Sequence, residues 1–350
     1  MVQHGKRGKS ADWQSGCLPI GLPKGGWHPL KRPKPLEQTG NTAVKRKYSH
    51  IQRRFKSAFD PTIGRLAVVI LQLARSVDRV QIADCFGFLM RKIGPRLPRH
   101  RLGRANLAAA FPEKSMTEID QILSDVWDNI GRVAAEFAHL DRIRIGNDKH
   151  TDSADVTFDS CALACLDQIR QNAKPTIFFA AHIANWEIPA LVPPLVGLES
   201  YALYRPPNNQ KIDDAIVRLR TTCMGTLVPA GFDAPLRLAN ALKKGAHIGM
   251  LVDQQYRRGV DVTFFGRTCK ANPLLAELAR RFDCPVRGVR VMRLRNRNAF
   301  RGELTEPIEL RRDSDGKINV QHTMQTITSI IERWAREDPG QWLWLHGRWH

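Results

Sequence analysis

One segment of the chain, PTIFFAAHIANWEIPA at 175–190, has side chains whose types and spacing suit acid–base chemistry. An apolar run ends at Ala180, His182 follows it, and Glu187 comes five residues later. Reactive side chains commonly emerge where the strands of an α/β sheet end. Five helical residues turn through about 500°, so we expect His182 in the turn before a helix and Glu187 in its first turns. There the carboxylate can bend back to the imidazole, leaving the other ring nitrogen free to deprotonate an alcohol.

The same two side chains also have simpler interpretations. A histidine near a glutamate is usually structural, and a metal site would need a third ligand that the sequence does not offer at a suitable spacing. Gly-rich fingerprints for dinucleotides or phosphates are missing too, which argues against NAD or ATP chemistry. The spacing alone leaves catalysis and a structural role open, and we expect neither a metal nor another cofactor.

Short β-rich runs alternate with helical patterns after Asp152, which is typical of an α/β sheet with crossover helices. We predict a central, mostly parallel mixed sheet flanked by helices. The expected strands are 176–180, 201–204, 225–228, 247–252, 260–265 and 286–294. The expected helices are 186–195, 212–223, 234–244, 274–282 and 320–337.

Residues 1–150 differ from this α/β domain, which we place at 151–350. Residues 1–58 combine Gly, Pro, Lys and Arg with few periodic apolar positions, so we predict a disordered basic tail. Residues 59–150 are expected to be helical and to associate with a membrane. Their last long helix should begin at Ser115, because Glu118 completes a capping box there.

The first helix of this region has two possible roles. Apolar residues recur at helical spacing from Leu66 to Val80, with Arg65, Arg75 and Arg79 on other faces. The helix could pack on the core, or it could lie on anionic lipid, held by its apolar stripe and its arginines. A cationic stretch at 91–104 follows, which suits either a phosphate-rich surface or a solvated loop.

The net charge of +20 indicates an attraction to polyanions: nucleic acid, anionic lipid or an acidic carrier protein. The first sixty residues contribute thirteen basic against three acidic side chains, 13 − 3 = +10, so the rest of the chain is basic as well. The sequence lacks a long apolar spanning segment and a secretory signal, and we read its seven cysteines as reduced thiols. We therefore expect the protein to stay in the cytoplasm.

The block HIANWE resembles the His-x4-Asp/Glu motif of glycerolipid-type acyltransferases, and in particular the HFGNWE form of the lipid A late acyltransferases (lauroyl/myristoyl transferases). The resemblance extends in order from about residue 65 to the end of the chain. It rests on RANLAAAFPEKS at 104–115, YRPPNN at 204–209, LVDQQYRRGVDVTFFG at 251–266, LARRFDCPV at 278–286 and QWLWLHGRW at 341–349. Two departures are Ala184, where the family usually has Gly, and KANP at 270–273, which replaces a threonine-rich stretch.

The resemblance implies roles for further residues. Arg205 matches the family arginine near the active site and Asp253 its second acidic position; both are expected to bind substrate, unless they form a buried ion pair with each other. Asn185 is also a candidate for substrate binding, although shaping the turn suits it better, as it does Trp186. We expect structural roles for Asn106 and Glu136. The closing cluster of Trp342, Trp344, Arg348 and Trp349 could pack on the sheet or lie at a membrane interface.

The implied reaction is transfer of a fatty acyl chain from a thioester of an acyl carrier protein, or of CoA, to a hydroxyl of a lipid A precursor. His182 and Glu187 would form the general-base dyad, and backbone N–H groups after His182 could hold the oxyanion. The expected place is the cytoplasmic face of the bacterial inner membrane, with peripheral attachment. Alternatives are another glycolipid or lysophospholipid acceptor, or a basic nucleic-acid-binding protein, which would leave the HIANWE block unexplained.

Overall fold

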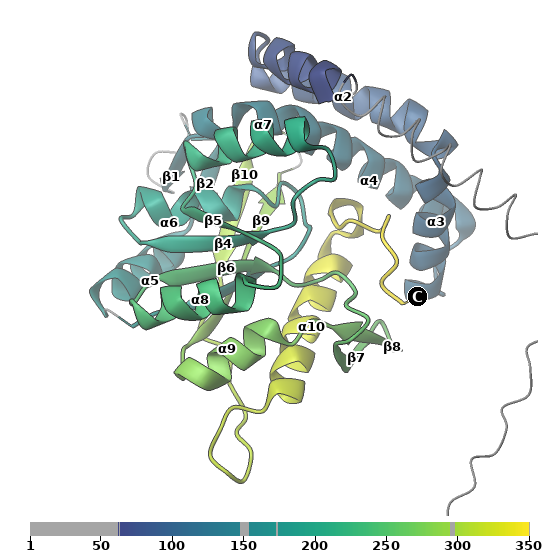
Figure 1. Cartoon of the computed structure of the whole chain (residues 1–350). Coiled ribbons are helices and arrows are strands. Elements are labelled where there is room, and N and C mark those ends of the chain that lie inside the picture. Colours follow the sequence, from purple (N-terminus) through teal and green to yellow (C-terminus); the bar gives the residue numbers. More distant parts are fainter. Residues whose placement is uncertain (1–61, 63, 148–153, 173, 295–297, 350) are drawn as a thin grey trace, which may run out of the picture. The chain divides into compact units, whose positions relative to one another are not determined.

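The computed structural model describes residues 62, 64–147, 154–172, 174–294 and 298–349 (Figure 1). The tail predicted at 1–58 lies outside these residues. Residues 64–75 are helical. The further helices are α2 (Arg79–Ile93), α3 (Pro98–Ala110), α4 (Met116–Glu136), α5 (Ser160–Gln171), α6 (Val192–Leu195), α7 (Gln210–Thr221), α8 (Ala234–Lys243), α9 (Leu274–Phe282) and α10 (Val320–Glu337), with 3₁₀ turns at Gly94–Arg96, Phe137–Arg142, Ile188–Leu191 and Pro339–Gln341.

A central sheet carries the fold, and its strand order is β1-β2-β10-β9-β3-β6-β4-β5. The strands are β1 (Ile145–Asn147), β2 (Val156–Phe158), β3 (Ile177–Ala180), β4 (Ser200–Tyr204), β5 (Thr226–Pro229), β6 (His247–Leu251), β9 (Val286–Arg293) and β10 (Phe300–Leu304). Neighbouring strands are parallel except β9 and β10. The predicted mostly parallel α/β sheet flanked by helices is therefore confirmed.

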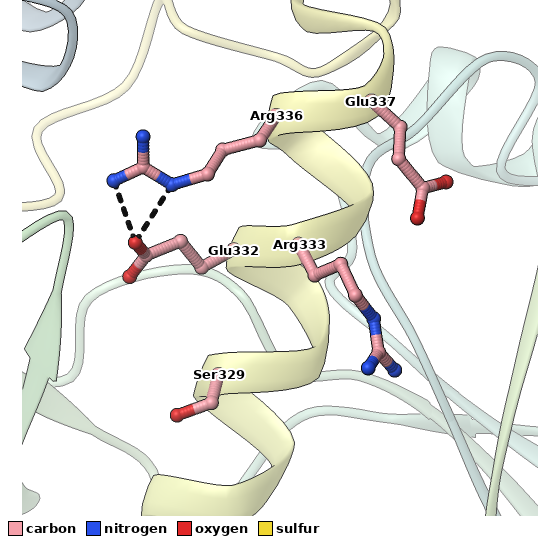
Figure 2. A pocket seen from close by; sticks show the side chains of 5 residues that line it. All are labelled: Ser329, Glu332, Arg333, Arg336 and Glu337. Carbon is pink, nitrogen blue, oxygen red and sulfur yellow. Dashed lines mark hydrogen bonds and ion pairs between the residues drawn. The ribbon is translucent and has the colours of Figure 1, made fainter.

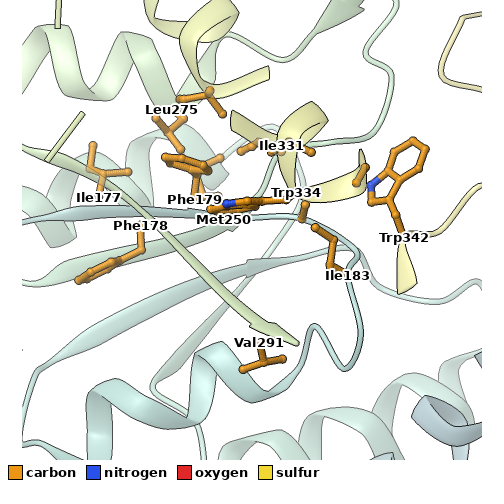
Figure 3. Packing of buried hydrophobic residues seen from close by; sticks show 14 of the residues in the cluster. Ile177, Phe178, Phe179, Ile183, Met250, Leu275, Val291, Ile331, Trp334 and Trp342 are labelled. Carbon is orange, nitrogen blue, oxygen red and sulfur yellow. The ribbon is translucent and has the colours of Figure 1, made fainter. Parts of the chain in front are cut away.

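Successive side chains of β3 point to opposite faces of the sheet, as its pleat requires. On one face, Phe179 stacks on Trp334 of α10 with ring centroids 5.7 Å apart, and Met250, Leu275 and Ile331 gather around them (Figure 3). Phe178 points to the opposite side of the strand in the same view. One face of the sheet is thus filled by helix side chains, whereas the other faces a cavity.

The hydrophobic core joins both halves of the described chain. Leu107 of α3 and Leu123 of α4 belong to the same buried cluster as Phe179 and Trp344. Helix α4 begins as predicted, because the Ser115 side chain accepts from the Glu118 amide and the Glu118 carboxylate accepts from the Ser115 amide. This helix packs along α2, and the described part of residues 59–150 shares its core with the sheet.

Several expected elements differ from the observed ones. The helix predicted at 186–195 is replaced by a 3₁₀ turn at Ile188–Leu191 and the short α6, because prolines at 189, 193 and 194 interrupt a regular helix. The run at 260–265 is not part of the main sheet; β7 (Val260–Phe264) pairs with the unpredicted β8 (Arg267–Ala271) as a separate hairpin. β1, β2 and β10 were not predicted either.

The helix predicted from 66 to 80 is interrupted. The first helical stretch ends at 75, and Asp78 caps the start of α2 by accepting from the amides of Val80 and Gln81. Arg75 pairs with Asp141 at 2.8 Å, and the Arg79 guanidinium lies 2.6 Å from Asp155. These two arginines therefore tie the helices to the protein, and of the two alternatives for this helix their contacts favour packing on the core.

No helix within the described ranges is both long and apolar enough to cross a bilayer. The exposed apolar side chains are instead concentrated near the beginning of this part of the chain. Those between residues 66 and 97 are Leu66, Val69, Ile70, Leu73, Val77, Phe88, Leu89, Ile93 and Leu97, whereas the later ones are scattered: Met116, Leu195, Phe232, Leu236, Tyr256 and Leu294.

Candidate active site

His182 and Asp253 lie at equivalent positions of neighbouring parallel strands. Ala180 of β3 pairs with Leu251 of β6, and each reactive residue follows two positions later. The strand ends therefore bring together side chains that are 71 residues apart in the sequence. His182 Nδ1 lies 2.7 Å from Asp253 Oδ1, and the His182 amide donates to Asp253 Oδ2 at 2.9 Å.

Asp253 is almost completely buried, with 1% of its surface exposed, and it is fixed from a third side. The indole Nε1 of Trp342 donates to Asp253 Oδ2 at 2.9 Å. A carboxylate that accepts at Nδ1 selects the tautomer in which His182 Nε2 carries the lone pair. Gln254 Nε2 lies 3.4 Å from that nitrogen. The arrangement leaves Nε2 to accept a proton from a bound molecule.

The charges in this pair stabilise each other. Burial by itself lowers the pKa of His182, but the charge of Asp253 and the hydrogen bond between them outweigh it, so this pKa lies above its ordinary value. Burial likewise raises the pKa of Asp253, yet the adjacent imidazole outweighs that effect and holds it well below its usual range. Asp253 is therefore a carboxylate at neutral pH and can stabilise an imidazolium.

Glu187 has a different partner from the one expected. Its carboxylate accepts two hydrogen bonds from Arg220 of α7, from Nε at 2.9 Å and from Nη2 at 2.6 Å. The expectation that Glu187 bends back to orient His182 is wrong as a description of contacts, since Asp253 occupies that place. The reason is that the chain after His182 does not continue into a regular helix, so Glu187 meets the guanidinium in a planar, two-bond arrangement.

The turn that joins His182 to Glu187 is held from beneath by a buried polar cluster. Asn185 donates to Glu136 at 3.0 Å and accepts from the Glu187 amide at 3.2 Å. Arg293 pairs with Glu136 at 2.5 Å, and Asn129 donates to the Ala184 carbonyl at 3.1 Å. The C-terminal segment closes the other side, since the Leu343 amide donates to the His182 carbonyl at 3.0 Å.

Several backbone N–H groups of this turn are already occupied. The amide of Ile183 donates to the Ala181 carbonyl, that of Ala184 to the Gln341 carbonyl, and that of Ile188 to the Asn185 carbonyl. Together with the Glu187 amide, these groups donate within the protein and do not point at a substrate. The expectation that amides after His182 form an oxyanion hole is therefore wrong for these positions.

A cavity of about 630 Å³ opens beside His182 and continues over the free face of the sheet. Its polar end includes His182, Glu187, Arg205, Arg220, Gln254 and Tyr256. Away from that end the lining is mostly apolar, with Ser200 as a polar exception, and it includes Phe178, Val192, Leu203, Met224, Val289 and Leu304. A volume of this size with a few polar groups at one end is typical of sites for small apolar ligands.

A second hollow lies along α10 and has a different character (Figure 2). Its lining residues are Ser329, Glu332, Arg333, Arg336 and Glu337, all from one helix, and Arg336 Nε donates to Glu332 at 2.9 Å. Its lining side chains are all polar or charged and include no histidine, so the cavity at His182 is the candidate for the chemistry. Within the described ranges, no cluster of three His, Cys, Asp or Glu side chains could hold a metal ion.

The sequence profile of the bacterial lipid A biosynthesis acyltransferases matches residues 52–350. The chain belongs to this family. It is therefore an acyltransferase of lipopolysaccharide biosynthesis, as the motif blocks predict. A search among curated proteins found no match.

Of the other predicted residues of this acyltransferase, one lines the cavity and two are buried away from it. Arg205 is exposed and lines the polar end of the cavity, so it forms no buried ion pair with Asp253. Asn185 is fully buried in the cluster beneath the turn and does not line the cavity, which makes its expected substrate contact wrong. Asn106 holds the C-terminal segment, since it donates to the carbonyls of Trp344 and His346 at 2.8 and 2.9 Å.

The C-terminal aromatic cluster packs inside this acyltransferase. Trp342, Trp344 and Arg348 are each 2% exposed or less, which excludes a membrane-interface position for these three side chains. Trp342 also supplies the indole that supports Asp253.

Sequence reasoning missed Arg220, the partner of Glu187. It lies four and eight residues after Ile216 and Ile212, so it occupies a position of the apolar stripe of α7. A lone arginine in such a stripe indicates a partly buried charge with a specific partner. This position in the stripe is the signal in the sequence that distinguishes Arg220 from the exposed Arg205.

Proposed function

We propose that this acyltransferase moves a fatty acyl chain from the thioester of an acyl carrier protein, or of CoA, to a hydroxyl of a lipid A precursor. The observation that carries the proposal is the His182 imidazole, backed by the buried Asp253 and open on its other nitrogen to an apolar cavity. A base beside an apolar slot is what transfer of a long acyl chain to an alcohol requires.

In the proposed reaction, His182 Nε2 removes the hydroxyl proton of the acceptor while Asp253 stabilises the imidazolium. The acceptor oxygen attacks the thioester carbonyl, and the new C–O bond replaces the C–S bond. The departing thiolate then takes up this proton from the imidazolium, which restores the neutral imidazole. No metal or nucleotide enters this balance of protons and bonds.

Glu187 acts in this proposal by holding Arg220. Its two hydrogen bonds use Nε and Nη2 of the guanidinium, which lines the same cavity as His182. A fixed cation at the polar end can stabilise the oxyanion that develops on the thioester carbonyl or bind a phosphate of the acceptor. Arg205, which is exposed at the same end, supports phosphate binding in the same way.

We further propose that residues 64–75 and the neighbouring α2 rest on the cytoplasmic face of the bacterial inner membrane. Leu66, Val69, Ile70 and Leu73 form an exposed stripe at helical spacing. Lys92, Arg96, Arg99 and Arg101 are exposed just beyond it and suit anionic lipid. The net charge of +20 would also attract an acidic carrier protein that brings the donor.

The proposed function is tested by mass spectrometry of lipid A from a strain that lacks this gene. We expect lipid A that has lost one acyl chain, restored by the wild-type gene and not by His182→Ala. Lipid A of unchanged mass in the deletion strain, with no compensating acyltransferase, would overturn the proposal. Loss of a chain from a different membrane lipid would reassign the acceptor.

A further inference from the structure

The sheet forms the floor of the cavity, and one residue in the middle of this floor, Gly249, has no side chain. Gly249 of β6 pairs with Phe178 of β3 on one side and with Ala202 of β4 on the other. All three residues line the cavity. They form one row across three neighbouring strands. Phe178 contributes a large ring to this row, Gly249 only a hydrogen atom and Ala202 only a methyl group.

The space above Gly249 is empty. A Cβ placed on this glycine would meet nothing within 4 Å, whereas on Gly288 or Gly302 it would come within 3 Å of aromatic side chains. Those two glycines are required by the packing around them, and Gly249 is not. Its backbone also does not require glycine, because its φ is not among the positive ones.

A glycine without a packing or conformational requirement weakens a strand interior by roughly 0.5–1 kcal/mol relative to alanine. Such a residue often marks the place where a ligand passes close to the backbone. Gly249 lies in the middle of β6, between the buried Ile248 and Met250, both of which belong to the core. The remaining reason for a glycine here is the cavity itself.

The distance of this row from His182 determines which part of a bound acyl chain lies above Gly249. Phe178 lies in β3 and His182 two residues beyond its end, so their separation of four residues spans at most roughly 13 Å at 3.3 Å per residue. A ligand group that reacts at His182 therefore has its tail, not its reacting atoms, above Gly249. A side chain at this position would obstruct the tail of a long chain and leave a short one unaffected.

Building on the proposed function, we infer that Gly249 sets the length of acyl chain that the cavity accepts, by leaving the slot open beyond the Phe178 row. The opposite face of β6 offers a matched control. Ile248 is fully buried, does not line the cavity and faces the packed side of the sheet. Ile248→Val thus perturbs the same strand without narrowing the slot.

The test uses the purified full-length protein as wild type, Gly249→Ala, Gly249→Leu and Ile248→Val. The relative kcat/KM is measured with saturated acyl thioesters from decanoyl to palmitoyl. We expect Gly249→Leu to lower kcat/KM for the longest donors about tenfold or more relative to the shortest. Gly249→Ala should give a smaller change in the same direction, and Ile248→Val should leave the length profile unchanged. If the leucine variant fails to fold, the alanine variant decides.

Binding of the corresponding free fatty acids, measured by calorimetry on the same variants, separates this inference from the proposed function. If the wild type binds long chains, Gly249→Leu selectively loses them, and no transfer to a lipid A precursor occurs, the slot assignment holds and the proposed function fails. If transfer occurs but every variant changes all chain lengths equally, the proposed function holds and the role of Gly249 is wrong.

Discussion

Asp253 orients the His182 imidazole and is itself held in place by several hydrogen bonds. It accepts from the His182 ring, from the His182 amide and from the Trp342 indole, so its position and the orientation of the imidazole are fixed together. The position of His182 just after the end of a strand could be predicted from the HIANWE block. The partner could not be assigned, because Asp253 is 71 residues away and only the register of β3 and β6 brings it to Nδ1.

We predict that Asp253→Asn lowers kcat by about 10³- to 10⁴-fold while the protein stays folded. An amide at this position can donate to Nδ1, which favours the wrong imidazole tautomer and removes the charge that stabilises the imidazolium. Steady-state kinetics and circular dichroism on the purified variant check this. Glu187→Gln is the comparison; it should lose less, since an amide oxygen can still accept from Arg220. A larger loss in Glu187→Gln would contradict Asp253 as the partner of the base.

The same pair predicts a pH dependence. A general base works in its neutral form, so the rate should rise with pH through the pKa of His182, which the charge of Asp253 holds above the ordinary 6.5 against the effect of burial. The acidic limb of the kcat/KM profile should therefore lie above pH 6.5 in the wild type. In Asp253→Asn, the limb should move to lower pH, although the maximal rate falls. A limb at the same pH in both proteins would show that Asp253 does not act on His182.

The turn from 181 to 187 is the element on which the site depends, and it is held by elements far apart in sequence. Sequence patterns located α9 and α10 with the bounds that the structure has, because their apolar periodicity is regular. They failed at 186–195, where prolines replace a helix by a 3₁₀ turn, and they missed the short β1 and β2. Irregular backbone depends on tertiary hydrogen bonds, which periodicity does not contain.

Ala184 is the strained residue of this turn, with a φ of 47°. The left-handed conformation costs about 1–2 kcal/mol for a residue with a Cβ, which explains why the resembling HFGNWE motif has glycine here. We predict that Ala184→Gly changes the free energy of unfolding by less than about 1 kcal/mol, because strain relief offsets the loss of a buried methyl group. Ala184→Val should be less stable than wild type by more than about 2 kcal/mol. Urea denaturation distinguishes them, and an Ala184→Val protein as stable as wild type would contradict the strain.

The buried pair beneath the turn predicts a second stability effect. Glu136 is completely buried and accepts two hydrogen bonds from Arg293, at 2.5 and 2.9 Å. Arg293→Met should lower the free energy of unfolding by about 3–5 kcal/mol, because it leaves a buried carboxylate without its counter-charge. The double variant Glu136→Gln/Arg293→Met should be more stable than Arg293→Met alone. If the double variant is the less stable of the two, the uncompensated charge is not the cause.

At the scale of the whole molecule, the described chain has a packed catalytic core and an exposed apolar stripe, at 66–73, that lies outside it. The family and the α/β class could be predicted from ordered motif blocks and from alternating strand and helix patterns. The contacts of Arg75 and Arg79 could not, because arginines on a helix look alike in sequence whether they face lipid or a carboxylate.

We predict that the protein binds anionic membranes through the exposed apolar stripe at 66–73. In vesicle flotation, the wild type should bind vesicles that contain anionic phosphatidylglycerol, and binding should weaken as salt screens charges over roughly 10 Å at 0.1 M. Leu66→Asp/Leu73→Asp should reduce binding at every salt concentration, whereas Arg99→Glu/Arg101→Glu should reduce it most at low salt. Arg104→Glu is a matched control, since Arg104 is paired with Asp120 at 2.6 Å. Equal flotation of the wild type and the Leu66→Asp/Leu73→Asp variant would contradict the stripe as the contact surface.

The most direct test of His182 as the catalytic base is acyl transfer by purified protein, with an acyl thioester as donor, a lipid A precursor as acceptor and mass spectrometry of the product. We predict a product heavier by one acyl group with the wild type. With His182→Ala the rate should be at least about 10³-fold lower, and the variant should keep the wild-type fold because the side chain acts as a base at the cavity. Transfer by folded His182→Ala at more than a few per cent of the wild-type rate would contradict His182 as the catalytic base.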